Sequence, residues 1–289
     1  MELRGDEPLY KTPGTASMDE ERWRRQMFEL FASERRAARV PGYSLEVDSD
    51  ITRHLPQGQD DEALLWLARF PKSAADRRIA EELANARKHG WQAEWKLHDF
   101  DEPDDLKTRL EARGLSCHHV EALMVLDVAG TRPRSFDETD VEVRAASTEE
   151  IDEIARVGEE VWNCRMPWLA RTLREMTDPV VGTASLYCAR TTDRVVGSGW
   201  IEFHGGSRFA QLCGGALLEA YRGRGIYSRL FELRVAEART RGVPYIAVDA
   251  APMSRPILER RGFRFVCHTY PMRTRAYEPL FSGLYHPDL

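Results

Sequence analysis

The stretch of sequence that decides the fold is FAQLCGGALLEAYRGRGIYSRLFELRVAEA, residues 209–238. It opens with an apolar run typical of a strand (209–217), passes a turn of alternating arginine and glycine (222–225), and continues as a long amphipathic segment (226–241). Glycine allows a tight turn and a close approach to a ligand, and the first amides of a helix have no partner inside it. The stretch therefore predicts a strand, a turn and a helix that together bind an anion such as a pyrophosphate.

The residues of the turn narrow the choice of anion site. Arg222 and Arg224 add positive charge that can pair with phosphate. The turn is not a GxxxxGK[ST] loop, and the letters IYS at 226–228 do not complete a GxGxxG pattern. A turn that binds no ligand is the alternative, and the agreement of strand, glycines and arginines argues against it.

Composition sets limits on the rest of the chain. The 289 residues are 42% hydrophobic and 30% charged, which is enough for one large domain or two ordinary ones. The net charge of −6 argues against a nucleic-acid-binding surface, which needs concentrated positive charge. No apolar run of about 18 residues is present, so no spanning helix is expected, and we expect no membrane partner. The N-terminal letters MELRGDEPLYKTPG do not have the apolar segment of a secretion signal.

The five cysteines are widely spaced and form no CxxC pair. They predict free thiols in a reducing cytoplasm, and neither a disulfide framework nor a zinc site. Cys117-His118-His119 has no second cluster of ligands, so no metal is expected there either.

Glycine- and proline-rich segments indicate two domains joined by a linker. We expect a flexible tail (1–17), an N-terminal domain (18–130), a linker rich in Pro, Gly and charge (131–139), a second domain (140–275) and a C-terminal tail (276–289). In the first domain we expect helices at 18–38, 74–89 and 104–113, and strands at 43–47, 62–70, 92–97 and 120–128. In the second we expect helices at 148–162, 169–176, 226–241 and 254–261, and strands at 141–146, 184–190, 195–204, 209–217, 245–249 and 263–272.

The two parts resemble each other. Residues 85–117 and 237–267 share an order of elements: a helix that ends at glycine (Gly90, Gly242), a strand, and a short helix that ends in Arg-Gly. This order favours a degenerate internal repeat, and the alternative is that any two helix–strand–helix units look alike.

The central motif resembles that of a known family. YRGRGIYSRL (221–230) is similar to the R/Q-x-x-G-x-G/A coenzyme A loop of the GNAT superfamily, and SRPILERRGFRF (254–265) is similar to the family's last helix and following strand. The resemblance implies a mixed α/β (α+β) GNAT fold, with a twisted, mostly antiparallel sheet flanked by helices and two lobes in tandem. The N-terminal lobe would be a degenerate copy, because its corresponding letters FPKSA (70–74) contain no glycine.

The resemblance also implies a co-substrate, acetyl-CoA, and residues that hold it. Backbone groups of Gly215 and Leu217 would hold the acetyl carbonyl and the pantetheine arm, and Gly214 with Gly215 would form a strand bulge that admits them. The pyrophosphate would lie on the backbone amides of the loop and of the first helical turn, Arg222, Gly223, Arg224, Gly225, Ile226, Tyr227 and Ser228.

The sequence departs from the family pattern at three positions. The last small residue of the loop is Tyr227, the tyrosine that often acts as general acid is replaced by Leu258, and a base glutamate of some members is replaced by Gln211. We therefore expect the base among polar residues of the strand 195–204, with Glu202 and His204 as candidates. Both are also common as solvent-facing strand residues.

Cys213 could act as a covalent nucleophile, and a buried inert thiol is the favoured alternative because no activating group adjoins it in sequence. The leading hypothesis is a cytoplasmic N-acetyltransferase that acts on a small-molecule amine or a peptide amine. The loops 163–168 and 204–209 would flank its acceptor cleft. The alternatives are a catalytically inactive acetyl-CoA-sensing module and an enzyme that uses another phosphate ligand. A monomer and a homodimer are both compatible with the sequence.

Overall fold

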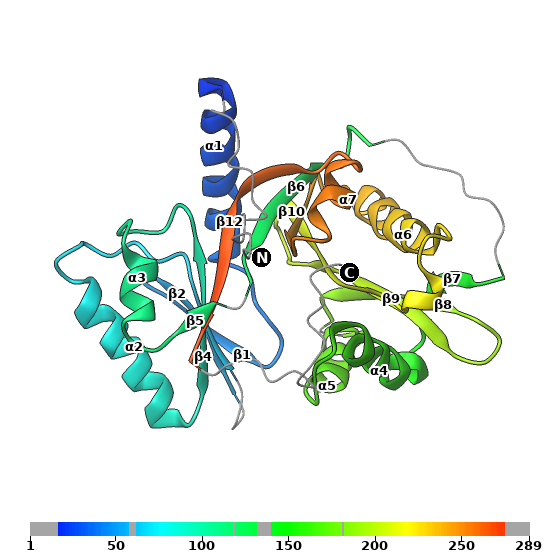
Figure 1. Cartoon of the computed structure of the whole chain (residues 1–289), viewed down its shortest axis with the longest axis horizontal. Coiled ribbons are helices and arrows are strands. Elements are labelled where there is room, and N and C mark those ends of the chain that lie inside the picture. The colour runs from blue at the N-terminus through cyan, green and yellow to red at the C-terminus, as the bar shows by residue number, and fades with distance from the viewer. Residues whose placement is uncertain (1–16, 58–61, 118, 132–139, 181, 275–289) are drawn as a thin grey trace, which may run out of the picture.

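The computed structural model describes residues 17–57, 62–117, 119–131, 140–180 and 182–274. Their strands form one 12-stranded sheet in the order β1-β2-β3-β4-β12-β6-β11-β10-β9-β8-β7, with the short β5 beside β12. The mixed, mostly antiparallel sheet and its flanking helices confirm the expected fold class (Figure 1). The predicted linker and tails fall almost wholly outside the described residues.

The N-terminal half contains three helices and six strands among its described residues. They are α1 (Met18–Arg35), β1 (Tyr43–Val47), β2 (Thr52–Pro56), β3 (Glu62–Trp66), α2 (Ala75–His89), β4 (Gln92–His98), α3 (Leu106–Glu111), β5 (Ser116–Cys117) and β6 (Glu121–Asp127). Strand β2 was not predicted because its letters, TRHLP, are polar and end in proline. It is nevertheless buried, because Arg53 forms an ion pair with Glu82 at 2.5 Å and His54 bonds to the carbonyl of Ala38 at 2.9 Å.

The C-terminal half follows the predicted order closely. Its elements are β7 (Glu142–Ala145), the 3-10 turn at Thr148–Glu150, α4 (Ile151–Trp162), α5 (Leu169–Met176), β8 (Ala184–Arg190), β9 (Val195–Phe203), β10 (Phe209–Leu217), a second 3-10 turn at Glu219–Tyr221, α6 (Ile226–Thr240), β11 (Tyr245–Ala250), α7 (Arg255–Glu259) and β12 (Arg264–Arg273). The strand 209–217 and the start of the following helix lie where the deciding stretch places them.

The helices cover the two faces of the sheet in separate groups. Met124 and Leu126 of β6 pack with α6 and α7, while Leu123 and Val125, which point the other way, pack with α1. Helices α2 and α3 lie on the α6 face, and α4 and α5 lie on the α1 face (Figure 1). The face that carries α1, α4 and α5 also carries the side chains of alternate residues on β9 and β10, from Trp200 onward.

The two halves exchange strands at the middle of the sheet. β6 of the N-terminal half lies between β11 and β12, and β12 of the C-terminal half lies between β4 and β6. In each half a parallel pair, β3–β4 or β10–β11, is connected through a helix, as the proposed internal repeat requires. The division into domains at 18–130 and 140–275 stays a prediction, because one continuous sheet passes through both.

The parallel pair β10–β11 opens along its length. The two strands are paired only from Phe209 to Gln211 on β10 and from Tyr245 to Ala247 on β11. On its other side β10 departs from regular pairing with β9 between Cys213 and Ala216, which is the bulge expected at Gly214 and Gly215. The opening and the bulge lie on the strand that leads into α6, so they adjoin the N-terminus of that helix.

Candidate functional site

The turn before α6 has the backbone that an anion site needs. Gly223 and Gly225 adopt φ values of +73° and +76°, in the left-handed region that favours glycine. A Cβ atom added at either residue would meet no described atom within 4 Å, so the turn borders open space. Among the described residues no side chain caps the helix, and the amides of its first turn have no partner inside it. These amides can bind phosphate oxygens, as the sequence predicts.

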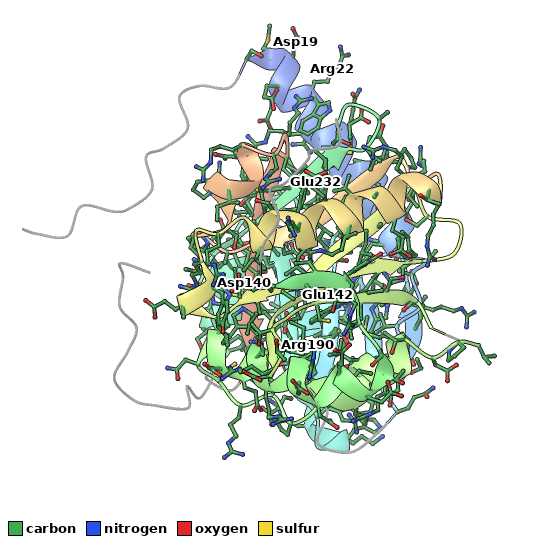
Figure 2. The ribbon with its side chains drawn as sticks, turned by 90° about the vertical axis from the view of Figure 1, so that its right-hand side faces the viewer. Asp19, Arg22, Asp140, Glu142, Arg190 and Glu232 are labelled. Atoms are coloured by element: carbon green, nitrogen blue, oxygen red, sulfur yellow. The ribbon has the colours of Figure 1, made fainter. Side chains whose placement is uncertain are left out.

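The arginines of the turn differ in their partners. Arg222 donates from Nε to the carbonyl of Leu217 at 3.2 Å, and no carboxylate lies within ion-pair distance of it among the described residues. Arg224 pairs with Asp140 of the segment before β7 and lies over the ring of Tyr221 at 5.4 Å. Asp140 lies below α6 in Figure 2, close to Glu142. Arg222 is exposed and bound only to a neutral group, so it can turn to an incoming phosphate.

Tyr227 lies against the bulge of β10. A Cβ atom on Gly215 would lie 2.8 Å from the Tyr227 hydroxyl oxygen, so the phenol occupies the space that glycine leaves. Behind it lies Arg234 of α6, which is 1% exposed and donates to the carbonyl of Cys213 at 3.3 Å. Burial lowers the pKa of Arg234, and the electrostatic interaction with the neighbouring Tyr227 opposes that shift. The absence of a side chain at Gly215 thus makes room for Tyr227.

Gly214, the other glycine of the bulge, lies against Trp200. Gly214 has a φ of +60°, and the indole of Trp200 on β9 fills the position that a Cβ atom would occupy. Trp200 in turn donates from Nε1 to the carboxylate of Glu202 at 3.1 Å. The bulge is therefore packed by a tyrosine on one side and a tryptophan on the other.

Glu202 and His204 lie on the same face of the sheet, two residues apart. Glu202 is paired across the strands with Gln211, the position at which some GNAT members carry a base. Its carboxylate lies 3.8 Å from Nε2 of His204 and contacts the thiol of Cys213. The structure therefore brings both predicted catalytic candidates together, next to the opening of β10 and β11.

The two candidates differ in their capacity to accept a proton. Burial and the neighbouring charge of Arg35 lower the pKa of His204 to about 3, so its ring is neutral at physiological pH. Its Nε2 already accepts a hydrogen bond from Arg35 Nη1 at 2.7 Å. Burial, and next the charge of Glu202, raise the pKa of the Cys213 thiol well above its usual value, which argues against a covalent cysteine route. Glu202 remains as the base candidate, because no described lysine or arginine lies within ion-pair distance of its carboxylate.

Three further charged residues meet where the two halves exchange strands. Lys96 of β4 lies 2.8 Å from the carboxylate of Asp249 on β11 and 3.3 Å from that of Glu121 on β6. Thr269 of β12 donates to Asp249 at 3.1 Å. Four strands from both halves thus meet around one ammonium group beside the opening.

Sequence reasoning missed Arg35, Lys96 and the position of Tyr227. Arg35 follows Trp23, Met27 and Phe31 at intervals of four, so a charged residue on an apolar helical stripe could have indicated it. Lys96 lies in a strand without a distinguishing motif, and only the pairing of β4 with β12 brings it to the site. Leu258, at the usual position of the acid, is 3% exposed and belongs to the core.

Two other features bear on the classes of function. No group of three or more metal-ligating side chains occurs within the described ranges. In the same part of the chain, every helix falls short of the length and apolarity that crossing a bilayer requires.

One family model and several solved structures match parts or most of this chain. The model of the acetyltransferase (GNAT) family matches residues 149–263. No curated protein sequence matches the chain. A GCN5-related N-acetyltransferase from Kribbella flavida is similar in structure with a TM-score of 0.62 at 11% identity, over 90% of this chain and 97% of that one.

Two further structures resemble the chain over most of its length. A tandem GNAT protein from the clavulanic acid biosynthesis pathway aligns with a TM-score of 0.57 at 13% identity, over 91% of this chain and 97% of that one. A GCN5-related N-acetyltransferase from Sphaerobacter thermophilus aligns with a TM-score of 0.55 at 17% identity, over 81% of this chain and 78% of that one. At these identities the likeness concerns the fold, and the family match rests on residues 149–263.

Proposed function

We propose that this chain, whose residues 149–263 match the acetyltransferase (GNAT) family and whose fold is similar to that of solved GNAT proteins, transfers an acetyl group from acetyl-CoA to a primary amine. The observation that carries the proposal is the open, uncapped N-terminus of α6, with left-handed glycines at 223 and 225, beside a bulged β10 that separates from β11.

The described residues fit acetyl-CoA as a co-substrate, whose thioester supplies the acetyl group. The amides of the loop and first turn, from Arg222 through Gly225 to Ser228, would bind the pyrophosphate. The opening between β10 and β11 beyond Gln211 would admit the pantetheine arm. Arg222 already donates a hydrogen bond to the carbonyl of Leu217. We therefore assign the backbone amide of Leu217 to the pantetheine arm.

Glu202 is the residue that we assign as general base. Transfer forms a bond between the amine nitrogen and the acetyl carbon and breaks the bond from that carbon to sulfur. The amine must lose a proton, and the Glu202 carboxylate adjoins the opening without an ion-pair partner among the described lysines and arginines. His204 is neutral, and its Nε2 already accepts a hydrogen bond from Arg35, so we do not assign the proton to it.

Tyr227 is the residue that we assign as general acid. The sulfur that leaves as a thiolate must gain a proton, and Leu258 cannot supply it. The Tyr227 hydroxyl lies against Gly215, where the thioester is expected, and the buried guanidinium of Arg234 interacts with Tyr227. A phenol oriented in this way can give its O–H proton to sulfur and recover it from water.

Calorimetric titration of the full chain with acetyl-CoA tests the proposal. We expect micromolar binding that an Arg222→Ala/Gly225→Trp double variant loses, and no comparable binding of ATP. Release of free thiol with a panel of amines then tests turnover. Binding without turnover of any amine would favour the alternative of an inactive acetyl-CoA-sensing module, and equal binding of ATP would refute the acetyl-CoA site.

A further inference from the structure

Two aromatic side chains pack against the glycines of the β10 bulge. The Tyr227 hydroxyl of α6 takes the space beside Gly215. The six-membered ring of Trp200 on β9 takes the space beside Gly214, where an added Cβ atom would lie 1.6 Å from its Cζ3. The side of β10 that faces β11 is open, because the two strands are paired only as far as Gln211. A thioester that enters through this opening therefore reaches a bulge with an aromatic ring on either side.

The indole of Trp200 is fixed at both of its ends. Its Nε1 donates to the carboxylate of Glu202 at 3.1 Å, and its six-membered ring rests on Gly214. Trp200 is 9% exposed and belongs to the same core cluster as Met166 and Leu169, which come from the start of α5 and the segment before it. Rotation of the indole would break the hydrogen bond and leave a void in a close-packed core. The ring is therefore a rigid wall of the site.

Glycine at position 214 allows this close approach of the ring to the main chain. The φ of Gly214 is +60°, and the ring atoms Cζ3, Cε3 and Cη2 of Trp200 would all lie within 2.2 Å of a Cβ atom there. A glycine inside a strand marks a place where another group comes close to the backbone, and here that group is the indole. The edge of the ring thus lies directly on the main chain of β10.

The indole lies close to the backbone group that we assign to the thioester. The amide nitrogen of Gly215 is separated from the Cα atom of Gly214 by about 2.4 Å, because only the carbonyl carbon of Gly214 lies between them. A hydrogen bond of about 2.9 Å from this amide to the thioester oxygen would hold the acyl carbon next to the ring. A methyl group adds little beyond that carbon, whereas each further methylene would have to displace a ring that is fixed.

We propose that Trp200 limits the length of the acyl group, so that the site accepts an acetyl group and discriminates against butyryl and longer chains. This inference rests on the proposed function, because it places the thioester at Gly215. Extra methylenes in a close-packed site force shifts of side chains and backbone, and such shifts are unfavourable. Trp200 is thus a specificity-determining residue that acts on the acyl donor and takes no part in proton transfer.

Calorimetric titration of the full chain with a series of thioesters tests the proposal without an acceptor amine. The ligands are coenzyme A, acetyl-CoA, butyryl-CoA and hexanoyl-CoA, each titrated under the same conditions. Butyryl-CoA and hexanoyl-CoA should bind at least about tenfold more weakly than acetyl-CoA, which is the lower end of the discrimination that one methylene gives in a fitted pocket. Equal affinity for the three thioesters would overturn the proposal.

Variants of Trp200 supply the second test. Trp200→Ala should raise the affinity for hexanoyl-CoA at least about tenfold relative to acetyl-CoA, because each methylene that becomes buried contributes roughly a fourfold gain. Trp200→Phe removes the ring that rests on Gly214 but keeps an aromatic group in the core, and it should accept butyryl-CoA. This variant covers the case in which alanine at a core position prevents folding.

The control is Trp162→Ala, because Trp162 is 38% exposed at the end of α4 in the same half of the protein. It should leave the preference for acetyl-CoA intact. A preference that persists in every folded Trp200 variant, with a lower Tm, would show that the indole only packs the core and would overturn the proposal.

The titrations also separate this inference from the proposed function. If coenzyme A and all the thioesters bind with equal affinity, the coenzyme A site stands and the limit on chain length fails. If neither coenzyme A nor any thioester binds, the proposed function fails, and the assignment of Trp200 fails with it.

Discussion

Replacement of Lys96 by methionine tests how strongly the exchanged strands depend on one buried cation. The Lys96 side chain is 14% exposed and holds the carboxylates of Asp249 and Glu121, which are 10% and 17% exposed. Methionine keeps the length of the chain and removes the charge, which leaves two carboxylates close together in the sheet. Removal of one partner from a buried ion pair costs about 3 to 5 kcal/mol, because an uncompensated charge stays behind.

The loss should be measured as a change in thermal and urea stability at pH 7. Unfolding entropy of about 2.1 cal/mol/K per residue gives roughly 0.6 kcal/mol/K for a chain of this length, so Tm should fall by about 5 to 8 °C. The control is Lys72→Met, because Lys72 is 76% exposed and lies 4.0 Å from Asp105. It should change the stability by less than about 0.5 kcal/mol.

The pH dependence identifies the cause. Burial alone would raise the pKa of Glu121, but Lys96 and His119 lower it to about 2 in the native protein. The stability from this shift is present above the unfolded value of 4.5 and is lost as the pH falls through the window from 4.5 toward 2. In the variant, burial and the Asp249 charge raise the pKa of Glu121, so acid relieves the defect.

The gap in Tm between wild type and Lys96→Met should therefore narrow from pH 7 to pH 4. Additional replacement of Glu121 by glutamine and Asp249 by asparagine should recover most of the lost stability at pH 7. A loss of unfolding free energy below about 1 kcal/mol at pH 7, or a Tm difference that is equal at pH 7 and pH 4, would refute the account of Lys96 as the cation that stabilises this junction.

Three further outcomes follow from the site. Tyr227→Phe should lower kcat about a hundredfold and leave acetyl-CoA binding intact. An unchanged kcat, measured by release of the coenzyme A thiol, would exclude Tyr227 as the acid. Glu202→Gln should lower kcat at least about a hundredfold with little change in Tm, and a normal kcat would move the base elsewhere. Gly214→Ala should lower Tm and weaken acetyl-CoA binding, because its Cβ would overlap Trp200 at a positive φ; a wild-type Tm would contradict that geometry.

Much of the architecture could be predicted because local signals agree along the chain. The glycines after α2 and α6 and the strands β8, β9 and β10 lie close to where the sequence predicts them. β2 escaped prediction, since TRHLP is polar and its burial depends on Glu82, which is distant in sequence. The exchange of β6 and β12 also escaped, because strand pairing across the halves leaves no trace in local periodicity.

The sequence by itself determined the loop, the helix that follows it and the glycine bulge, because backbone conformation and unpaired amides depend on residues next to one another. Tertiary structure alone decided which side chains lie beside the opening of β10 and β11. Arg35 from α1, Lys96 from β4 and Glu202 from β9 meet only through strand order and register, which depend on contacts between residues far apart in the chain. The same long-range contacts turned Tyr227, a departure from the loop pattern, into the hydroxyl that faces Gly215.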